Sequence, residues 1–260
     1  MFIEKYGSGK DVIILVHGGP SLYGYMGTLG KELEDNYTIV DYAQSGTFES
    51  PLSEKVSIDS HINDLIALVN ENSGTGKVII IGHSWGADVA LLASGKDSTN
   101  IEKLILIGTA ALNEEISDKH GDTLNKRYTD TVKEQLKEIE VELNKELSID
   151  KRNSVMQKRL ALTSPFYHLD PKTEELVPES KWNFETFLQS IDSLWDLIDA
   201  GKIPSILKDV KVPVVAYQGD YDPIPYKETF EFLENSISNI ETHVIEKSGH
   251  FPWLEATSKD

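Results

Sequence analysis

The feature that most constrains this chain is a Gly-x-Ser-x-Gly motif between an apolar run and an Ala/Leu-rich segment. Residues 79–81 read Ile-Ile-Ile, residues 82–86 read Gly-His-Ser-Trp-Gly, and Ala and Leu are frequent in residues 87–92. A strand that passes through such a motif into a helix turns sharply, and side chains at the two glycines would collide with the neighbouring strand or helix. The pattern therefore predicts a strained turn that lifts the Ser84 hydroxyl above the sheet edge. It also places the Trp85 N–H at a helix N-terminus, where it can face a developing oxyanion.

The alternative is a tight Gly-Ser-Gly turn with no chemistry, and the context of the motif decides between the two. Apolar, largely β-branched runs predict strands at residues 12–16, 37–40, 79–81, 104–107, 212–217 and 242–245. Between them, residues 28–36 and a segment that starts at Ile58 have the apolar spacing of helices. Alternating strands and helices are typical of parallel crossover units. We therefore predict an α/β fold with a mostly parallel, doubly wound sheet.

A long segment between the predicted strands has a different pattern. Residues 113–203 contain no β-branched run, and Val132, Leu136, Ile139, Leu143 and Leu147 fall on one face of a predicted amphipathic helix. A second predicted helix is rich in aromatic residues, which would form either a core stripe or a roof over Ser84. We predict an all-helical cap at 113–203, inserted between core segments 1–112 and 204–260. The aromatic candidates for substrate contact are Trp182, Phe184, Phe187 and Trp195.

The composition limits the classes of partner and chemistry. With 25 basic and 43 acidic side chains the net charge is −18, which should repel nucleic acid and anionic lipid surfaces. The chain has no cysteine, so its chemistry must rest on oxygen and imidazole groups, and we expect no metal and no cofactor. The first residues lack a basic start followed by a long apolar run, and no apolar stretch is long enough to span a membrane. We therefore expect a soluble, cytoplasmic protein.

Three further loops follow predicted strands, at the sheet edge where open parallel sheets bind ligands. Residues 17–20 read His-Gly-Gly-Pro, residues 219–223 read Gly-Asp-Tyr-Asp-Pro, and residues 249–253 read Gly-His-Phe-Pro-Trp. A serine hydroxyl needs a neighbouring imidazole to take its proton, and that imidazole needs a carboxylate on its other nitrogen. His250 can be the imidazole, and either carboxylate in residues 219–223 can be the acid.

With these four motifs the chain resembles the α/β-hydrolase superfamily over nearly its whole length. The resemblance implies a catalytic triad of Ser84, Asp222 and His250, with Asp220 the less favoured acid. It also implies that the N–H groups of Gly19 and Trp85 form the oxyanion hole. The Ser-Trp-Gly turn together with the His-Gly-Gly-Pro loop looks most like the proline iminopeptidase branch.

The chain departs from that branch in two places. Residues 41–46 read Asp-Tyr-Ala-Gln-Ser-Gly, without the arginine usual in this loop. The branch also uses a pair of cap carboxylates to receive the substrate's free amine, and no such pair aligns in this sequence, where the acidic candidates are Glu174, Glu175, Glu179 and Glu185. The chain ends ten residues after His250, where the family normally adds a closing helix. Either that helix is dispensable or the sequence is a fragment.

We expect a serine hydrolase that acts by acyl transfer on a small carboxylic ester or related acyl substrate. One alternative is a proline iminopeptidase-like aminopeptidase that cleaves short peptides, and another is a small-molecule-binding receptor that retains the triad. The oligomeric state stays open, because the sequence contains no indication of it.

Overall fold

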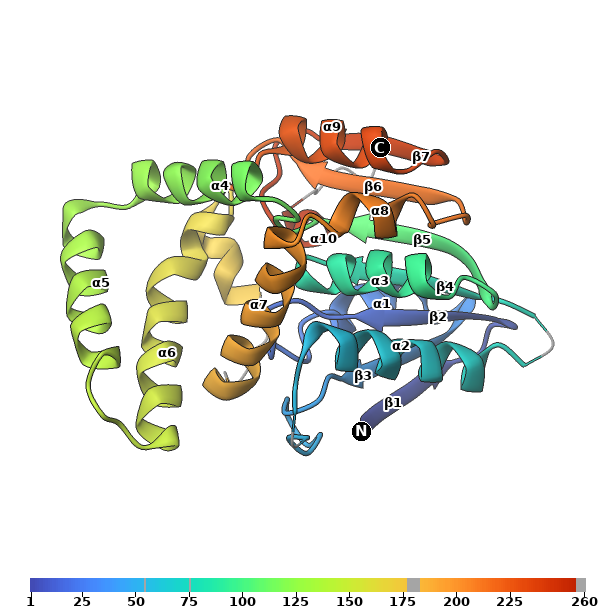
Figure 1. Cartoon of the computed structure of the whole chain (residues 1–260), viewed down its shortest axis with the longest axis horizontal. Helices are drawn as coiled ribbons and strands as arrows, with labels where there is room; N and C mark the ends of the chain where they lie inside the picture. Colours follow the sequence, from blue (N-terminus) through green and yellow to red (C-terminus); the bar gives the residue numbers. More distant parts are fainter. Residues whose placement is uncertain (54, 75, 177–182, 256–260) are drawn as a thin grey trace.

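The computed structural model describes residues 1–53, 55–74, 76–176 and 183–255. A seven-stranded sheet with the order β1-β3-β2-β4-β5-β6-β7 forms its centre (Figure 1). Its strands are β1 (Phe2–Gly7), β2 (Asp11–Val16), β3 (Tyr37–Ala43), β4 (Val78–His83), β5 (Ile101–Ile107), β6 (Val214–Gly219) and β7 (Ile240–Ile245). Only β1 pairs antiparallel with its neighbour, β3, and the other neighbouring strands are parallel. The predicted α/β fold is confirmed.

Helices cover both faces of this sheet and gather at one of its ends. The helices of the core are α1 (Gly27–Leu33), α2 (Ile58–Asn72), α3 (Trp85–Lys96), α8 (Ile203–Leu207), α9 (Tyr226–Ser236) and α10 (Pro252–Glu255). The intervening segment forms α4 (Glu114–Arg127), α5 (Asp130–Leu143), α6 (Ile149–Thr163), the 3₁₀ turns η1 (Ser164–Tyr167) and η2 (Pro171–Leu176), and α7 (Phe184–Asp199). In Figure 1, α4 to α7 lie at the left, beyond the ends of β5 and β6.

The core is split by the sheet into two apolar layers. Successive side chains of a strand point to opposite faces, so the β-branched run of β2 serves both layers. Ile14 and Val16 are fully buried in the layer that contains α2, α3 and α9. Ile13 and Leu15 are buried in the smaller layer on the α1 side. The strands are thereby held rigidly, and the loops at their carboxyl ends are fixed with them.

Polar side chains of α7 attach this helix to the start of α2. The Ser193 hydroxyl accepts a hydrogen bond from the Ile58 N–H at 2.7 Å, and Ser190 Oγ lies 2.9 Å from Nε2 of the buried His61. Leu194 packs into the main core layer from the same helix. These contacts fix the wall that α7 presents to the strand ends.

Several elements differ from the sequence-based expectations in presence or extent. Strand β1 was not expected, since as an exposed edge strand it lacks a buried β-branched run. Strand β6 begins at Val214 rather than at residue 212. The helix expected to continue to Leu147 ends at Leu143, because Ser148 caps a new helix, α6, by accepting from the Lys151 N–H. The helical spacing of apolar residues continues across this break, although the helix itself ends.

Among the described residues, we find no helix with both the length and the apolar character needed to cross a bilayer.

Candidate active site

The chain turns sharply where β4 meets α3, and Ser84 is at the turn. Its backbone has φ 54° and ψ −127°, a left-handed conformation that a non-glycine residue rarely adopts. A residue held this way costs of order 1–3 kcal/mol. A Cβ at Gly82 would lie 2.5 Å from the Gly86 carbonyl oxygen, so the close approach requires glycine. The strained turn expected from the motif is therefore present.

His250 and Asp222 form a buried pair beside this turn. His250 Nδ1 lies 2.8 Å from Asp222 Oδ2, and the side chains are 5% and 0% exposed. The other carboxylate oxygen of Asp222 accepts a hydrogen bond from the Ile224 N–H at 2.9 Å. Asp220 instead accepts from the Ser248 N–H at 3.2 Å. Of the two carboxylates considered from the sequence, the structure brings Asp222 to the imidazole.

Ser84 and His250 line a common cavity of about 750 Å³, together with Gly19 and Trp85. Gly18 lies directly against the serine, because a Cβ there would be 2.8 Å from Ser84 Cβ. Gly19 has φ +118°, a backbone conformation that favours glycine. Trp85 is the first residue of α3, and the first N–H groups of a helix have no partner within it. Four of the five residues assigned to the triad and the oxyanion hole therefore line one cavity, and the fifth, Asp222, is hydrogen-bonded to His250.

A buried hydrogen-bond chain connects the loop, the turn and His250. The Gly18 N–H donates to the Tyr25 hydroxyl at 2.6 Å, and that hydroxyl lies 2.7 Å from His83 Nδ1. His83 Nε2 lies 2.8 Å from the backbone carbonyl of His250. A carbonyl only accepts, so Nε2 donates and Nδ1 accepts from Tyr25. Burial lowers the pKa of His83 well below its ordinary value, which keeps it in this neutral form.

Gln44 connects the loop after β3 to His17 and to Trp85. Its backbone N–H donates to His17 Nε2 at 3.1 Å, and its side-chain amide donates to the His17 carbonyl at 2.7 Å. The Trp85 indole N–H donates to the Gln44 Oε1 at 3.0 Å. Burial lowers the pKa of His17 to about 4, so its imidazole is neutral and can accept. This loop, which lacks the arginine of the iminopeptidase branch, thus supports the site through an amide.

Glu255 fixes the loop behind His250. Its carboxylate accepts from the Gly249 N–H and, at 2.7 Å, from the Leu169 N–H after η1. The His250 N–H donates to the Tyr167 carbonyl at 2.8 Å. The segment around η1 is therefore joined to the histidine loop at two points. No local pattern marks Glu255 or Tyr167, since neither belongs to a recognisable motif.

The four aromatic candidates for substrate contact have different locations. Phe187 and Trp195 of α7 line the cavity. Phe184 begins α7 but is not among the described residues that line the cavity, and the Arg152 guanidinium lies 5.6 Å from its ring. Trp182 lies outside the described residues.

The acidic cap candidates do not line the cavity within the described part of the chain. Glu185 lies 3.6 Å from the Arg152 guanidinium, in an ion pair. Glu179 and the side chains of Glu174 and Glu175 fall outside what the structure describes. Besides histidines, the acidic and basic side chains that line the cavity in the described part of the chain are Asp88 and Arg159. Across the described ranges, no cluster of three or more acidic or histidine side chains is arranged to hold a metal ion.

Comparisons with known proteins identify the family. The family model of the alpha/beta hydrolase fold matches residues 11–257. A proline iminopeptidase from Thermoplasma volcanium is 30% identical over 102 residues, which are 38% of this chain and 35% of that protein. A putative esterase/lipase from Haemophilus influenzae is 32% identical over 99 residues, which are 37% of this chain and 33% of that protein. These matches span about a third of the length of the curated relatives.

Solved structures share the whole fold with this chain. An alpha/beta fold family hydrolase from Bacillus anthracis has a TM-score of 0.70 at 22% identity, over 98% of this chain and 90% of that chain. A thermophilic esterase from Thermogutta terrifontis has a TM-score of 0.66 at 21% identity, over 98% of this chain and 88% of that chain. At this identity the similarity concerns the fold.

Proposed function

The chain belongs to the alpha/beta hydrolase fold family, and we propose that it is a serine hydrolase that cleaves small carboxylic esters by acyl transfer. One observation supports this most strongly: His250, in a buried pair with Asp222, and Ser84, on a strained turn, line the same cavity. A buried carboxylate that accepts from imidazole Nδ1 leaves Nε2 free to take a proton from a serine hydroxyl. Structural similarity to esterases is consistent with this activity but concerns the fold.

In the proposed reaction Ser84 Oγ attacks the ester carbonyl carbon while His250 takes the hydroxyl proton. The N–H groups of Gly19 and Trp85 stabilise the negative charge on the carbonyl oxygen. His250 then gives its proton to the leaving alcohol, the C–O bond breaks, and the acyl group stays on Ser84. A water molecule, deprotonated by His250, attacks the acyl carbon, the bond between that carbon and Ser84 Oγ breaks, and His250 returns the proton to Oγ as the carboxylic acid leaves. Asp222 holds the imidazole in the required tautomer throughout.

The charges around the cavity favour esters over peptides with a free N-terminal amine. Binding a protonated amine away from water requires a paired carboxylate. Among its described residues, the cap instead contributes the cation Arg159, which repels an ammonium group, and the fully buried Asp88 comes from the core. Phe187 and Trp195 offer an apolar wall suited to a short acyl chain.

The aminopeptidase alternative keeps one specific point of support, the 30% identity to a proline iminopeptidase over 102 residues. A substrate panel separates the three candidates. Nitrophenyl acetate, butyrate and hexanoate are compared with prolyl and alanyl anilides and their N-acetyl counterparts. We expect the highest kcat/KM for a short-chain ester. Efficient cleavage of prolyl anilide, abolished by N-acetylation, would favour the aminopeptidase, and absence of turnover on every substrate would favour a receptor.

A further inference from the structure

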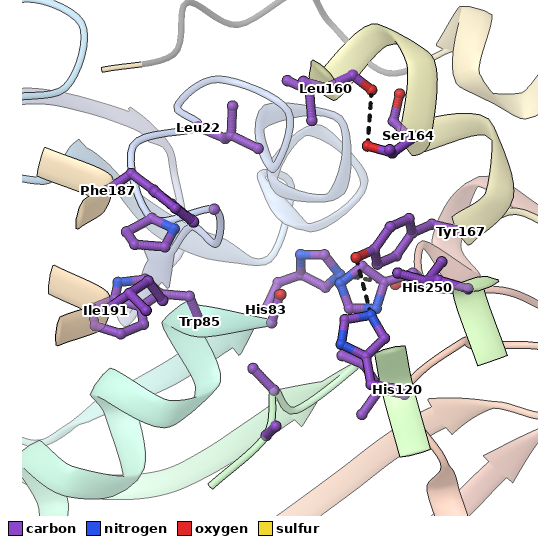
Figure 2. Close-up of a pocket in the computed structure, with 18 of the residues that line it drawn as sticks. Leu22, His83, Trp85, His120, Leu160, Ser164, Tyr167, Phe187, Ile191 and His250 are labelled. Atoms are coloured by element: carbon purple, nitrogen blue, oxygen red, sulfur yellow. Dashed lines mark hydrogen bonds between the residues drawn. The ribbon is translucent and has the colours of Figure 1, made fainter. Parts of the chain in front are cut away.

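The cavity has one apolar side and one polar side, and the polar side has no role in the reaction described above. Figure 2 shows Phe187 and Ile191 on one side of the cavity. On the other side His120, from α4, and Tyr167, from η1, lie next to His250. A substrate that spans the cavity therefore meets hydrocarbon at one end and hydrogen-bonding groups at the other.

His120 and Tyr167 are joined to each other. His120 Nε2 lies 3.0 Å from the Tyr167 hydroxyl, and the two rings meet edge to face with centroids 5.6 Å apart. Both residues are partly exposed and both line the cavity. Burial lowers the pKa of His120 to about 4 and raises the pKa of Tyr167 above its ordinary value. Both groups are therefore neutral near pH 7.

The hydrogen bond between them leaves capacity for a ligand. A neutral imidazole has one donor and one acceptor, and a phenol has one donor and acceptor lone pairs. Their mutual bond uses one donor and one acceptor, whichever ring donates. One N–H or O–H and at least one lone pair remain for a third group. A hydroxyl group is an uncharged partner that can donate and accept at the same time.

His120 and Tyr167 are held beside His250, which protonates the leaving alcohol in the proposed reaction. The Tyr167 carbonyl accepts from the His250 N–H at 2.8 Å, and their ring centroids are 5.3 Å apart. Arg127 donates to the carbonyls of Phe166 and Tyr221, at 2.9 Å and 2.7 Å, and so joins η1 to the loop of the triad acid. Since His250 must protonate the leaving oxygen, the alcohol part of an ester lies next to this pair.

We propose that His120 and Tyr167 form a subsite for a second hydroxyl on the leaving alcohol, so that monoesters of polyhydric alcohols are preferred over plain alkyl esters. This inference rests on the proposed ester hydrolysis. The acyl chain would then lie against the apolar wall of α7. The free hydroxyl would donate to one member of the pair and accept from the other.

The test compares 2,3-dihydroxypropyl butyrate with propyl butyrate, which share an acyl group and a three-carbon alcohol. The readout is the ratio of their kcat/KM values in the wild type, Tyr167→Phe, His120→Phe and the control Tyr128→Phe. The Tyr128 ring packs edge to face on Phe166, and Tyr128 is not among the described cavity-lining residues. We expect a wild-type ratio of about ten or more, since a site built around a substrate hydroxyl discriminates against its absence. The ratio should fall toward one in Tyr167→Phe and His120→Phe and stay unchanged in Tyr128→Phe.

The outcomes separate this inference from the proposed function. Nitrophenyl butyrate is assayed in parallel: if the wild type cleaves none of the three esters, the proposed function itself is wrong. If the wild type cleaves 2,3-dihydroxypropyl butyrate and propyl butyrate with a kcat/KM ratio near one, the proposed subsite is wrong. It is also wrong if Tyr167→Phe and His120→Phe both retain the wild-type ratio. Should Tyr167→Phe fail to fold, a ratio retained in His120→Phe contradicts the proposal equally.

Discussion

His83 Nε2 donates to the backbone carbonyl of His250 across 2.8 Å, although the two residues are 167 positions apart in the chain. The neighbour of the candidate nucleophile therefore holds the backbone of the candidate base. His83 in turn accepts from Tyr25, which accepts from the Gly18 N–H beside the oxyanion loop. One buried imidazole thus sets the relative position of three loops.

Replacing Tyr25 with Phe should impair both stability and catalysis. The change leaves the Gly18 N–H and His83 Nδ1 without their buried partner, and each unsatisfied group costs about 1–3 kcal/mol. We expect a lower free energy of unfolding in urea, and a kcat on nitrophenyl butyrate reduced by more than about tenfold because the loops lose their common support.

Tyr23→Phe is the matched control, since its hydroxyl donates to Glu4 at 2.9 Å, away from the described cavity-lining residues. Equal kinetic effects of the two substitutions would contradict the positioning role of Tyr25.

The two carboxylates near His250 should differ sharply in their contribution to rate. Asp222→Asn removes the acceptor for His250 Nδ1–H and favours the wrong tautomer, so kcat should fall on the order of ten-thousandfold. Asp220→Asn weakens only a contact with the Ser248 N–H and should cost far less. Steady-state kinetics of both variants checks this order, and the reverse order would show that the triad acid is assigned to the wrong residue.

Stability should depend on pH through Asp88. Burial raises the pKa of this fully buried carboxyl well above its ordinary value of 3.8. Above about pH 4 the unfolded chain releases this proton while the folded protein keeps it, so the wild type loses about 1.4 kcal/mol of stability per pH unit until the folded pKa is reached. Asp88→Asn has no titrating group at position 88, so it does not lose this part of its free energy of unfolding as the pH rises.

Urea unfolding of the wild type and Asp88→Asn at pH 5 and pH 7 tests this, because other titrating groups cancel in the difference. The stability of Asp88→Asn relative to the wild type should increase with pH. A difference that stays constant between these pH values would mean that Asp88 is ionised in the folded protein.

The catalytic candidates could be predicted from the sequence because each lies in a short, glycine-containing turn directly after a strand. Ser84 and His250 line one cavity, and Asp222 is hydrogen-bonded to His250, because parallel strands end at one edge of the sheet. The strands themselves were predictable from apolar runs, apart from the exposed edge strand β1. Local pattern and topology were sufficient for these residues.

The supporting residues could not be predicted in the same way. Tyr25 and His83 are 58 positions apart, and His120 and Tyr167 are 47 apart. Their roles depend on how α4, η1 and the loop after β2 dock onto the sheet, which no local spacing encodes. The helix break after Leu143 was missed because apolar periodicity continues through it, and only the cap formed by Ser148 marks the new start.

Removing the hydroxyl of Ser84 should abolish turnover while leaving the fold intact. Loss of the nucleophile of a coupled triad costs on the order of a millionfold in kcat. Ser94→Ala is the control and should retain activity. Ser94 belongs to α3, the helix that follows Ser84, and is not among the described residues that line the cavity. Residual activity of Ser84→Ala above a few per cent of the wild type would contradict the assignment.

The most direct test of the central claim is covalent labelling of the intact protein with a fluorophosphonate, followed by mass spectrometry and peptide mapping. The account predicts that the wild type gains one phosphonyl group, located on Ser84, because His250 and Asp222 activate this hydroxyl. Ser84→Ala should gain none, and Asp222→Asn should react much more slowly. An unlabelled wild type, or a label on any other residue, would contradict the claim that Ser84 is the nucleophile.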